Sequence, residues 1–189
     1  MQNLAQKIES NLSRELESFC AKPVVNFLVQ SFLDHLYPLA PAIHIPSFLA
    51  DFHDNRQSRD LKFFNLLVSL TVVTLCTLSE AFERCKELDT AFRFATRKDM
   101  LEAGDQLIRH SSPSDYYDDL SLDQWACHFL MMLAMGQQGL MRRANMHHAQ
   151  ATSIFRQMNL HRVSTYHGLN KIKQQLGKKA LWINFTTVR

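Results

Sequence analysis

Glycine and proline are scarce in this sequence of 189 residues, which contains five of each. Average usage would give roughly 23 of the two together. No glycine precedes Gly104, and four of the five prolines lie between Pro23 and Pro46. Hairpins and barrels need these residues for tight turns, so the shortage disfavours β-sandwich and β-propeller folds. It also excludes glycine-rich phosphate loops, because neither G-x-G-x-x-G nor G-x-x-x-x-G-K occurs.

Acidic residues are missing from the last third of the chain. Residues 124–189 contain nine Lys/Arg and no Asp/Glu, whereas residues 1–123 contain 12 Lys/Arg and all 18 acids. The net charge is therefore −6 in the front part and +9 in the back part. A segment that carries charge of only one sign needs oppositely charged partners. Three explanations stay open: the acidic part neutralises the basic part, nucleic acid binds it, or an acidic complement lies beyond Arg189.

Cysteine and histidine form no recognisable catalytic or metal-binding pattern. The four cysteines are scattered without C-x-x-C, which is typical of buried free thiols in a reducing compartment. The adjacent His147 and His148 would point about 100° apart on a helix and would not easily bind one ion. The acidic stretch 115–123 lacks the glycine and the terminal glutamate of an EF-hand. We expect no enzymatic activity, no metal and no cofactor in this chain.

The sequence also predicts no signal sequence and no membrane span. Charged residues occur throughout the N-terminus. The uncharged run near the middle, residues 63–79, has 17 residues, and a spanning helix needs about 20. This run is expected to form a buried core helix.

Hydrophobic periodicity predicts an all-α fold, a multi-helix bundle of about seven helices with an irregular proline-rich connector near residues 38–46. Ser47, Asp60 and Ser121 are expected to cap the helices that follow them, Ser121 in a capping box with Gln124. The predicted helices cover residues 4–19, 24–37, 61–82, 89–110, 122–136, 144–158 and 170–183, with a short helix at 48–52.

The proline-rich connector carries a family resemblance. Its spacing fits Tyr-Pro-x-x-Pro-x-x-His-x-Pro-(Ser/Thr)-Phe through Tyr37, Pro38, Pro41, His44, Pro46, Ser47 and Phe48. The sequence resembles here the fungal-specific transcription factor domain, the middle homology region of zinc binuclear cluster transcription factors. In that family the element introduces a helical region.

Later stretches extend the resemblance over roughly residues 25–189. A long apolar helix at 61–82, a Ser-Leu helix start at 121–122 and a Leu-Gly-Leu-His-Arg element at 158–162 occur in family order, with Asn159 in place of the glycine. The stretch 174–182 partly matches the family's Trp-containing helix, with Gln175 where Glu is common and Gly177 where a basic residue is common.

The resemblance implies one helical regulatory domain over residues 1–189, with an N-terminal helix at 1–22 and the family-like region at 23–189. It further implies a truncated part of a larger domain, a nuclear location, and DNA contact only through a zinc-binding domain absent here. The domain would control transcription through intramolecular, protein or small-molecule inducer contacts. A free-standing helical adaptor without a transcriptional role is the alternative.

The candidate interaction residues fall into three sets. His44 is either a structural histidine or part of an inducer pocket between helices. Four basic residues either pair with acidic loop residues such as Asp118 and Asp119 or form a surface for a partner: Arg142, Arg143, Lys178 and Lys179. The last helix is expected to leave an apolar face with Trp182 or Phe185 incompletely covered. The full set of candidates is His44, Arg142, Arg143, His161, Arg162, Lys178, Lys179 and Trp182.

Overall fold

The computed structural model describes residues 12, 15–113 and 115–187, and in these residues it contains helices and loops but no strand. The all-α prediction is confirmed, with eight helices of seven or more residues in the described part. The elements are α2 (Lys22–Ser31), the π-helix η1 (Phe32–Leu36), α3 (Ile45–His53), the 3-10 helix η2 (Arg56–Ser58), α4 (Leu61–Thr77), α5 (Ser79–Leu88), α6 (Arg97–Ser111), α7 (Leu122–Gln137), α8 (Met141–Gln157), α9 (Val163–Tyr166) and α10 (Lys171–Thr187).

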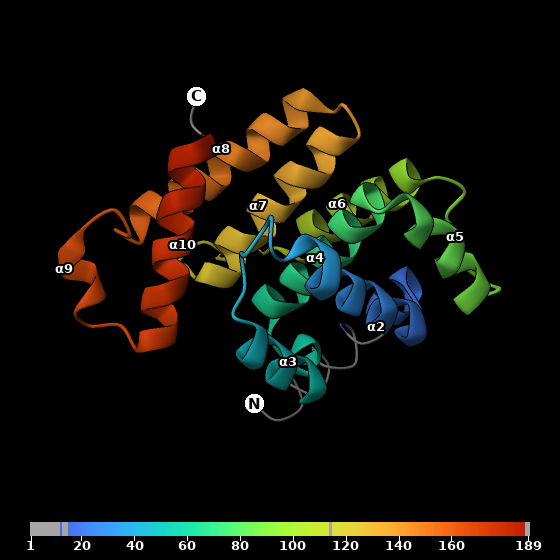
Figure 1. Cartoon of the computed structure of the whole chain (residues 1–189), viewed down its shortest axis with the longest axis horizontal. Coiled ribbons are helices and arrows are strands. Elements are labelled where there is room, and N and C mark those ends of the chain that lie inside the picture. The colour runs from blue at the N-terminus through green and yellow to red at the C-terminus, as the bar shows by residue number, and fades with distance from the viewer. Residues whose placement is uncertain (1–11, 13–14, 114, 188–189) are drawn as a thin grey trace.

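Helix α4 forms the centre of the core. Every side chain from Phe63 to Cys76 is buried, as expected for a helix that is apolar on nearly all sides. Helix α4 packs against α2, α6 and α7, and α7 in turn packs against α8 (Figure 1). The prediction of a buried core helix in the uncharged run is therefore confirmed.

The predicted helix at 61–82 extends too far, because α4 ends at Thr77. The chain turns at Leu78, whose backbone is extended (φ −92°, ψ 108°), and α5 leaves α4 at 116°. The residues after this point carry charges, including Glu80, Glu83 and Arg84. These side chains could not continue along the axis of α4 through the core without being desolvated, so the helix bends outward.

Capping residues set two further boundaries. The predicted capping box of Ser121 and Gln124 is present at the start of α7. The helix expected at 89–110 begins only at Arg97, because Thr96 and Asp99 form a second capping box there. Both boxes satisfy backbone N–H groups that have no partner in the first turn of a helix.

The predicted N-terminal helix lies largely outside the described residues, including its positions Leu4 and Ile8. Residues 15–19 are helical, and Leu12 and Phe19 are buried in the core. Helix α2 starts at Lys22 with Pro23 in its first turn, where a missing N–H costs nothing. The division of the chain near residue 22 stays a prediction.

In the described residues no single helix is long and apolar enough to cross a membrane. By length and composition α4 and α5 could do so only together, and they are sharply bent at Leu78.

Helices α4 and α6 approach each other closely at Gly104. A Cβ atom at this position would lie 2.6 Å from Cγ2 of Val72, closer than real carbon atoms come. Gly136 in α7 has no neighbouring atom within 4 Å of the same hypothetical Cβ. The two helical glycines therefore differ in packing and form a matched pair.

We predict that Gly104→Ala lowers the free energy of unfolding by about 1–3 kcal/mol through overpacking. Gly136→Ala should raise it by as much as about 1 kcal/mol, because alanine favours the helix. Urea denaturation of the whole chain measures both values. Equal stabilisation by the two substitutions would contradict the close packing of α4 and α6.

Candidate functional site

A cavity of about 550 Å³ lies between α3, η2, the start of α4, the loop at 119–121, the start of α7, the end of α8 and the start of α10. Apolar side chains such as Phe48, Leu120 and Ile172 line much of its wall. His44 and Lys173 add polar groups. Concave sites of this size, mostly apolar with a few polar groups, are typical of small-molecule binding.

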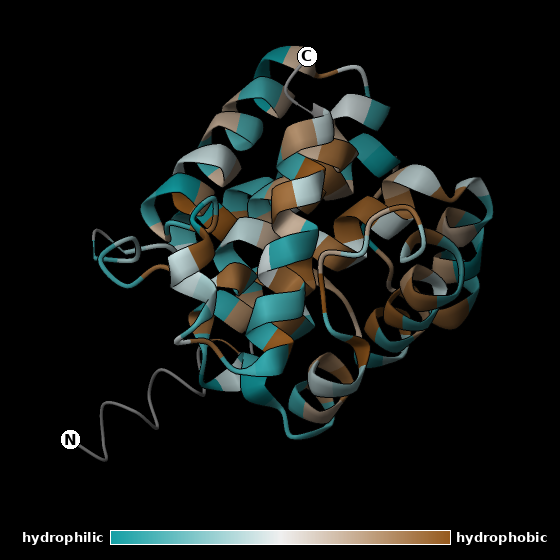
Figure 2. Cartoon of the chain, turned by 60° about the vertical axis from the view of Figure 1, so that its left-hand side comes forward, coloured by the Kyte–Doolittle hydropathy of each residue, from teal (hydrophilic) through white to brown (hydrophobic). Residues whose placement is uncertain are grey.

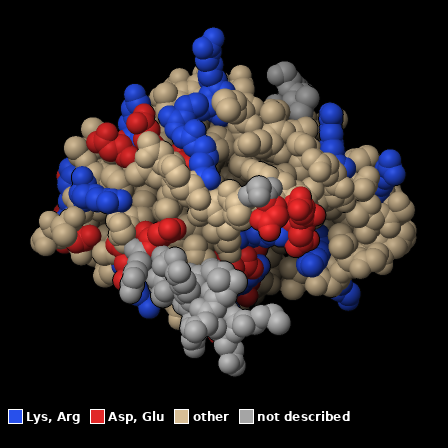
Figure 3. Space-filling view, turned by 180° about the vertical axis from the view of Figure 1, so that it is seen from behind, with Lys and Arg blue, Asp and Glu red and all other residues tan. Residues whose placement is uncertain are grey.

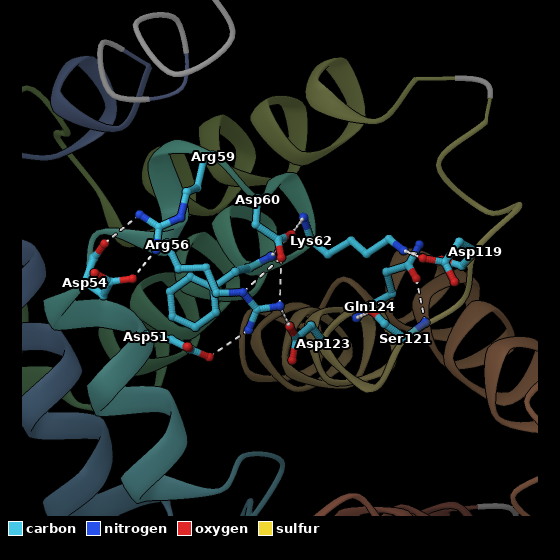
Figure 4. A network of polar contacts seen from close by, with 11 residues as sticks. Asp51, Asp54, Arg56, Arg59, Asp60, Lys62, Asp119, Ser121, Asp123 and Gln124 are labelled. Carbon is cyan, nitrogen blue, oxygen red and sulfur yellow. Dashed lines mark hydrogen bonds and ion pairs between the residues drawn. The ribbon is translucent and has the colours of Figure 1, made fainter. Parts of the chain in front are cut away.

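A single guanidinium group, that of Arg56, ties three segments around this cavity together (Figure 4). Its Nη1 donates to Oδ2 of Asp51 in α3 at 2.8 Å, and its Nε donates to Oδ2 of Asp60 before α4 at 2.9 Å. Its Nη2 donates to Oδ2 of Asp123 in the first turn of α7 at 2.9 Å. Because the guanidinium holds its donors in fixed directions, it sets the relative positions of these helix ends.

Asp60 also caps the start of α4. Its Oδ1 accepts hydrogen bonds from the backbone N–H groups of Lys62 at 2.9 Å and Phe63 at 3.2 Å, which confirms Asp60 as the cap of α4. The guanidinium carbon of Arg56 also lies 5.0 Å from the centre of the Phe63 ring. The start of the core helix is thus joined directly to the polar wall of the cavity.

Negative charge exceeds positive charge around Arg56. Burial raises the pKa of Asp123 above its ordinary value, Asp60 and Asp51 add to the rise, and Arg56 opposes it. Burial also disfavours the Arg56 cation, but the three carboxylates outweigh burial and hold its pKa above the ordinary value. The side of the cavity next to Arg56 therefore presents carboxylate acceptors, and this side favours ligand groups that donate hydrogen bonds.

His44 lies half-buried beside the cavity and caps α3. Its Nδ1 accepts from the backbone N–H of Ser47 at 3.4 Å and lies 2.8 Å from the Ser47 hydroxyl. The expected cap, Ser47, is therefore wrong by three residues: His44 is the cap, and Pro46 sits in the first turn of the helix. The histidine has a structural contact and also lines the cavity.

The separate stretches that carry the family resemblance meet at this cavity. The proline-rich element contributes His44, the long apolar helix Phe63, and the Ser-Leu element Ser121. The 158–162 element contributes Leu160, and the 174–182 stretch contributes Leu176. The order of motifs along the chain thus corresponds to one place in the fold.

Comparison with known proteins agrees with this arrangement. Residues 29–187 match the family described as Fungal specific transcription factor domain. The chain belongs to this family. No curated protein and no solved structure matches it. The family is not enzymatic, and membership makes this domain part of a fungal transcription factor's regulatory region.

Asn159 occupies a position at which the family usually has glycine, and its backbone conformation explains that preference. Asn159 has a left-handed backbone (φ 54°), and the N–H of buried Leu160 bonds to the carbonyl of Phe155 at 3.2 Å, which closes the end of α8. Glycine adopts this conformation without strain, and asparagine is the usual substitute. In this chain the element that corresponds to the family's Leu-Gly-Leu is therefore a helix C-terminus.

The two candidate arginines of α8 are not paired with the 115–123 loop. Arg143 forms ion pairs with Asp105 and Glu102 of α6, and Arg142 is exposed. The loop carboxylate of Asp119 instead pairs with Lys62 at 2.8 Å. The expected pairing with this loop is wrong, because α8 lies beside α7 with its Arg143 side turned toward α6.

The remaining candidates lie in two places outside the cavity, the turn after α8 and helix α10. His161 and Arg162 are exposed in the turn after α8. Lys179 donates to the Tyr37 hydroxyl at 2.8 Å, which joins α10 to the proline-rich connector. Lys178 and Trp182 are exposed on α10. The candidate set therefore does not form one site, and of its members only His44 lines the cavity.

Direct ion pairs between the Lys and Arg of the basic part and the acids of the front part are few in the described residues. Arg143 is the one Lys or Arg after residue 123 with a carboxylate within 4.0 Å there. The other ion pairs join acids to cations of the front part, as between Arg56 and its three aspartates. In the view from behind, red and blue side chains lie close together over much of the face, while those at the right-hand edge are blue (Figure 3).

A buried polar chain between α6, α7 and α8 was missed by the sequence analysis. Oδ1 of Asp105 lies 3.2 Å from Nε2 of His147, and Nδ1 of His147 lies 3.1 Å from Nδ1 of His128. Nε2 of His128 lies 3.2 Å from the Tyr117 hydroxyl. Helical spacing alone could have placed His128 and His147 on inner faces, but their contact depends on how α7 and α8 pack.

The polar chain and the cysteines have the properties of structural groups. Hydrogen bonds from His147 and Arg143 overcome burial and lower the pKa of Asp105 to about 2. Burial and His147 lower the pKa of His128 to about 3. Burial raises the pKa of each cysteine thiol to about 12, so none is an activated nucleophile. No group of three or more metal-ligating side chains occurs in the described residues.

Because His128 is neutral in the folded chain, we predict that the free energy of unfolding falls in acid. Between its ordinary pKa of about 6.5 and its folded value of about 3, the unfolded chain binds a proton that the folded chain does not. The free energy of unfolding should therefore fall below pH 6.5, by at most about 1.4 kcal/mol per pH unit for this residue. Urea denaturation at pH 7.5, 6, 5 and 4.5 measures the slope.

His128→Gln should flatten this slope, although it also lowers stability at neutral pH. His35→Gln, at an exposed position of η1, should leave the slope unchanged. An unaltered slope in His128→Gln would show that acid sensitivity arises elsewhere.

Proposed function

We propose that this domain is the regulatory, non-DNA-reading part of a nuclear fungal transcription factor, and that a small molecule bound in the cavity controls it. DNA would be read by a separate zinc-containing domain of the parent protein. Contacts with protein partners or with other parts of the parent would pass on the state of the cavity. Regulation would then act at the cavity, where side chains of the separate family elements meet.

The observation that carries the proposal is the convergence of the family elements on one cavity. Side chains from the proline-rich connector, α4, the loop before α7, the turn after α8 and α10 all line it. A ligand there would contact segments from both the front and the back of the chain. Its binding energy could therefore change how these segments sit together, which is what a regulatory ligand must do.

The chemistry of the walls indicates the class of ligand. The apolar side chains favour an aromatic or aliphatic body. The carboxylates around Arg56 accept hydrogen bonds, so hydroxyl groups fit the polar wall better than carboxyl groups do. We infer a neutral, hydroxylated organic molecule. Family membership favours this transcriptional role over a free-standing adaptor.

A thermal-shift screen of the whole chain tests the proposal with sugars, aromatic alcohols and the corresponding aromatic acids. At ligand concentrations well above the dissociation constant, a hydroxylated compound should raise the melting temperature by roughly 3 °C or more. The acid analogue should give a smaller shift.

Ile172→Trp at the cavity's edge should remove the shift by filling the space, while Val163→Trp on exposed α9 should retain it. A flat screen, or a shift that survives Ile172→Trp, would contradict a ligand in this cavity.

A further inference from the structure

The outer face of α10 carries a stripe of two lysines and two aromatic residues. Lys171, Lys178, Trp182 and Phe185 follow one another at intervals of seven, four and three, so they share one face of the helix. Trp182 is 69% and Phe185 74% exposed, and their rings meet edge to face with centroids 6.4 Å apart. This confirms the expectation that the last helix leaves an apolar face uncovered. Figure 2 turns α10 to the front, where it runs up toward the C-terminus.

The opposite face of α10 holds the helix firmly in place. Ala180 is completely buried, and Gly177 packs against Tyr166 and Leu160. Asn184 is buried and bonds to the Ala180 carbonyl at 2.8 Å, and Thr152 of α8 reaches its side chain. The aromatic stripe is therefore presented on a fixed helix, and a partner would not have to order the helix first.

The charged side chains of α10 all have one sign. The helix contains no Asp or Glu, and neither does any other part of the sequence after residue 123. The cation next to the stripe, Lys179, is bound to a tyrosine hydroxyl rather than to a carboxylate. Lys171 and Lys178 are exposed on the stripe itself. The surface thus combines exposed aromatic rings with positive charge that no acidic residue of the helix offsets.

We propose that this stripe, defined by Lys171, Lys178, Trp182 and Phe185, binds an acidic amphipathic segment of a partner protein. Apolar side chains of that segment would cover the two rings, and its carboxylates would pair with the two lysines. Tryptophan is among the residues that most often dominate binding energy at protein interfaces. The inference deepens the regulatory role proposed above by giving the chemistry of the partner.

Other occupants fit the stripe less well. Duplex DNA is bound chiefly through several phosphate contacts, and here two large rings rather than a cluster of cations form one end of the stripe. A second copy of this chain would bring the same positive charges face to face, which opposes association. An acidic amphipathic segment would cover the rings with its apolar side chains and pair with the lysines through its carboxylates.

The test titrates the whole chain with a synthetic peptide of about 20 residues, which has leucine and phenylalanine at helical spacing and Asp/Glu between them. Trp182 is exposed and the other tryptophan, Trp125, is buried, so binding should shift the fluorescence of Trp182 to shorter wavelength. Peptides with the same composition in scrambled order, or with lysine in place of the acids, should bind much more weakly.

Variants locate the site. Replacing both Trp182 and Phe185 by alanine should weaken binding about tenfold or more, measured with a fluorophore on the peptide. Lys178→Glu should weaken it about fivefold and reduce its salt dependence. Lys98→Glu on α6 and Met141→Ala on α8 are the controls, because each changes an exposed residue of the same kind on another helix.

Four results would overturn the proposal: no binding, equal binding of the lysine peptide, displacement of the peptide by duplex DNA at physiological salt, or a dimer that the double alanine variant abolishes. None of these residues lines the cavity, so the thermal-shift screen still reports on the small-molecule site. Failure of the stripe and failure of the proposed function are thereby separable.

Discussion

The contact between Arg56 and three aspartates is the constraint on which the rest of the candidate site depends. One side chain in a three-residue helical turn fixes α3, the start of α4 and the start of α7 relative to one another. These segments contribute Phe48, Phe63 and Asp123 to the wall of the cavity. A guanidinium is suited to this, since it keeps its charge and presents several donors in one plane. Lysine would supply the charge without the three directions.

The same constraint connects the front and the back of the domain. The start of α7 is fixed by Arg56 through Asp123, α7 packs against α8, and the turn after α8 brings Leu160 to the cavity. Helix α10 then closes the cavity with Ile172 and Leu176 and presents its outer stripe to solvent. A ligand that shifts the inner face of α10 would also move the outer face. The cavity and the stripe thus lie on two sides of one element.

The sequence predicted the helices well where local chemistry decides. Asp60 and Ser121 identify helix starts because capping needs only neighbours within three residues. It failed where packing decides: the bend at Leu78 arises because charged side chains must leave the core, and the contact of His128 with His147 needs two helices to meet. The Arg56 cluster was also missed. Its aspartates lie up to 67 residues away, and no local pattern joins Arg56 to Asp123.

Hydrogen–deuterium exchange of Arg56→Gln, compared with the unaltered chain, tests the central claim most directly. The account predicts faster exchange in α3, in the first turns of α4 and α7 and in the loop at 119–121 together, with α6 and α8 unchanged. Arg59→Gln is the control, because Arg59 pairs with Asp54 alone and lies at the surface. Faster exchange confined to residues 56–58, or the same pattern in Arg59→Gln, would contradict the role of Arg56 as the group that holds the cavity together.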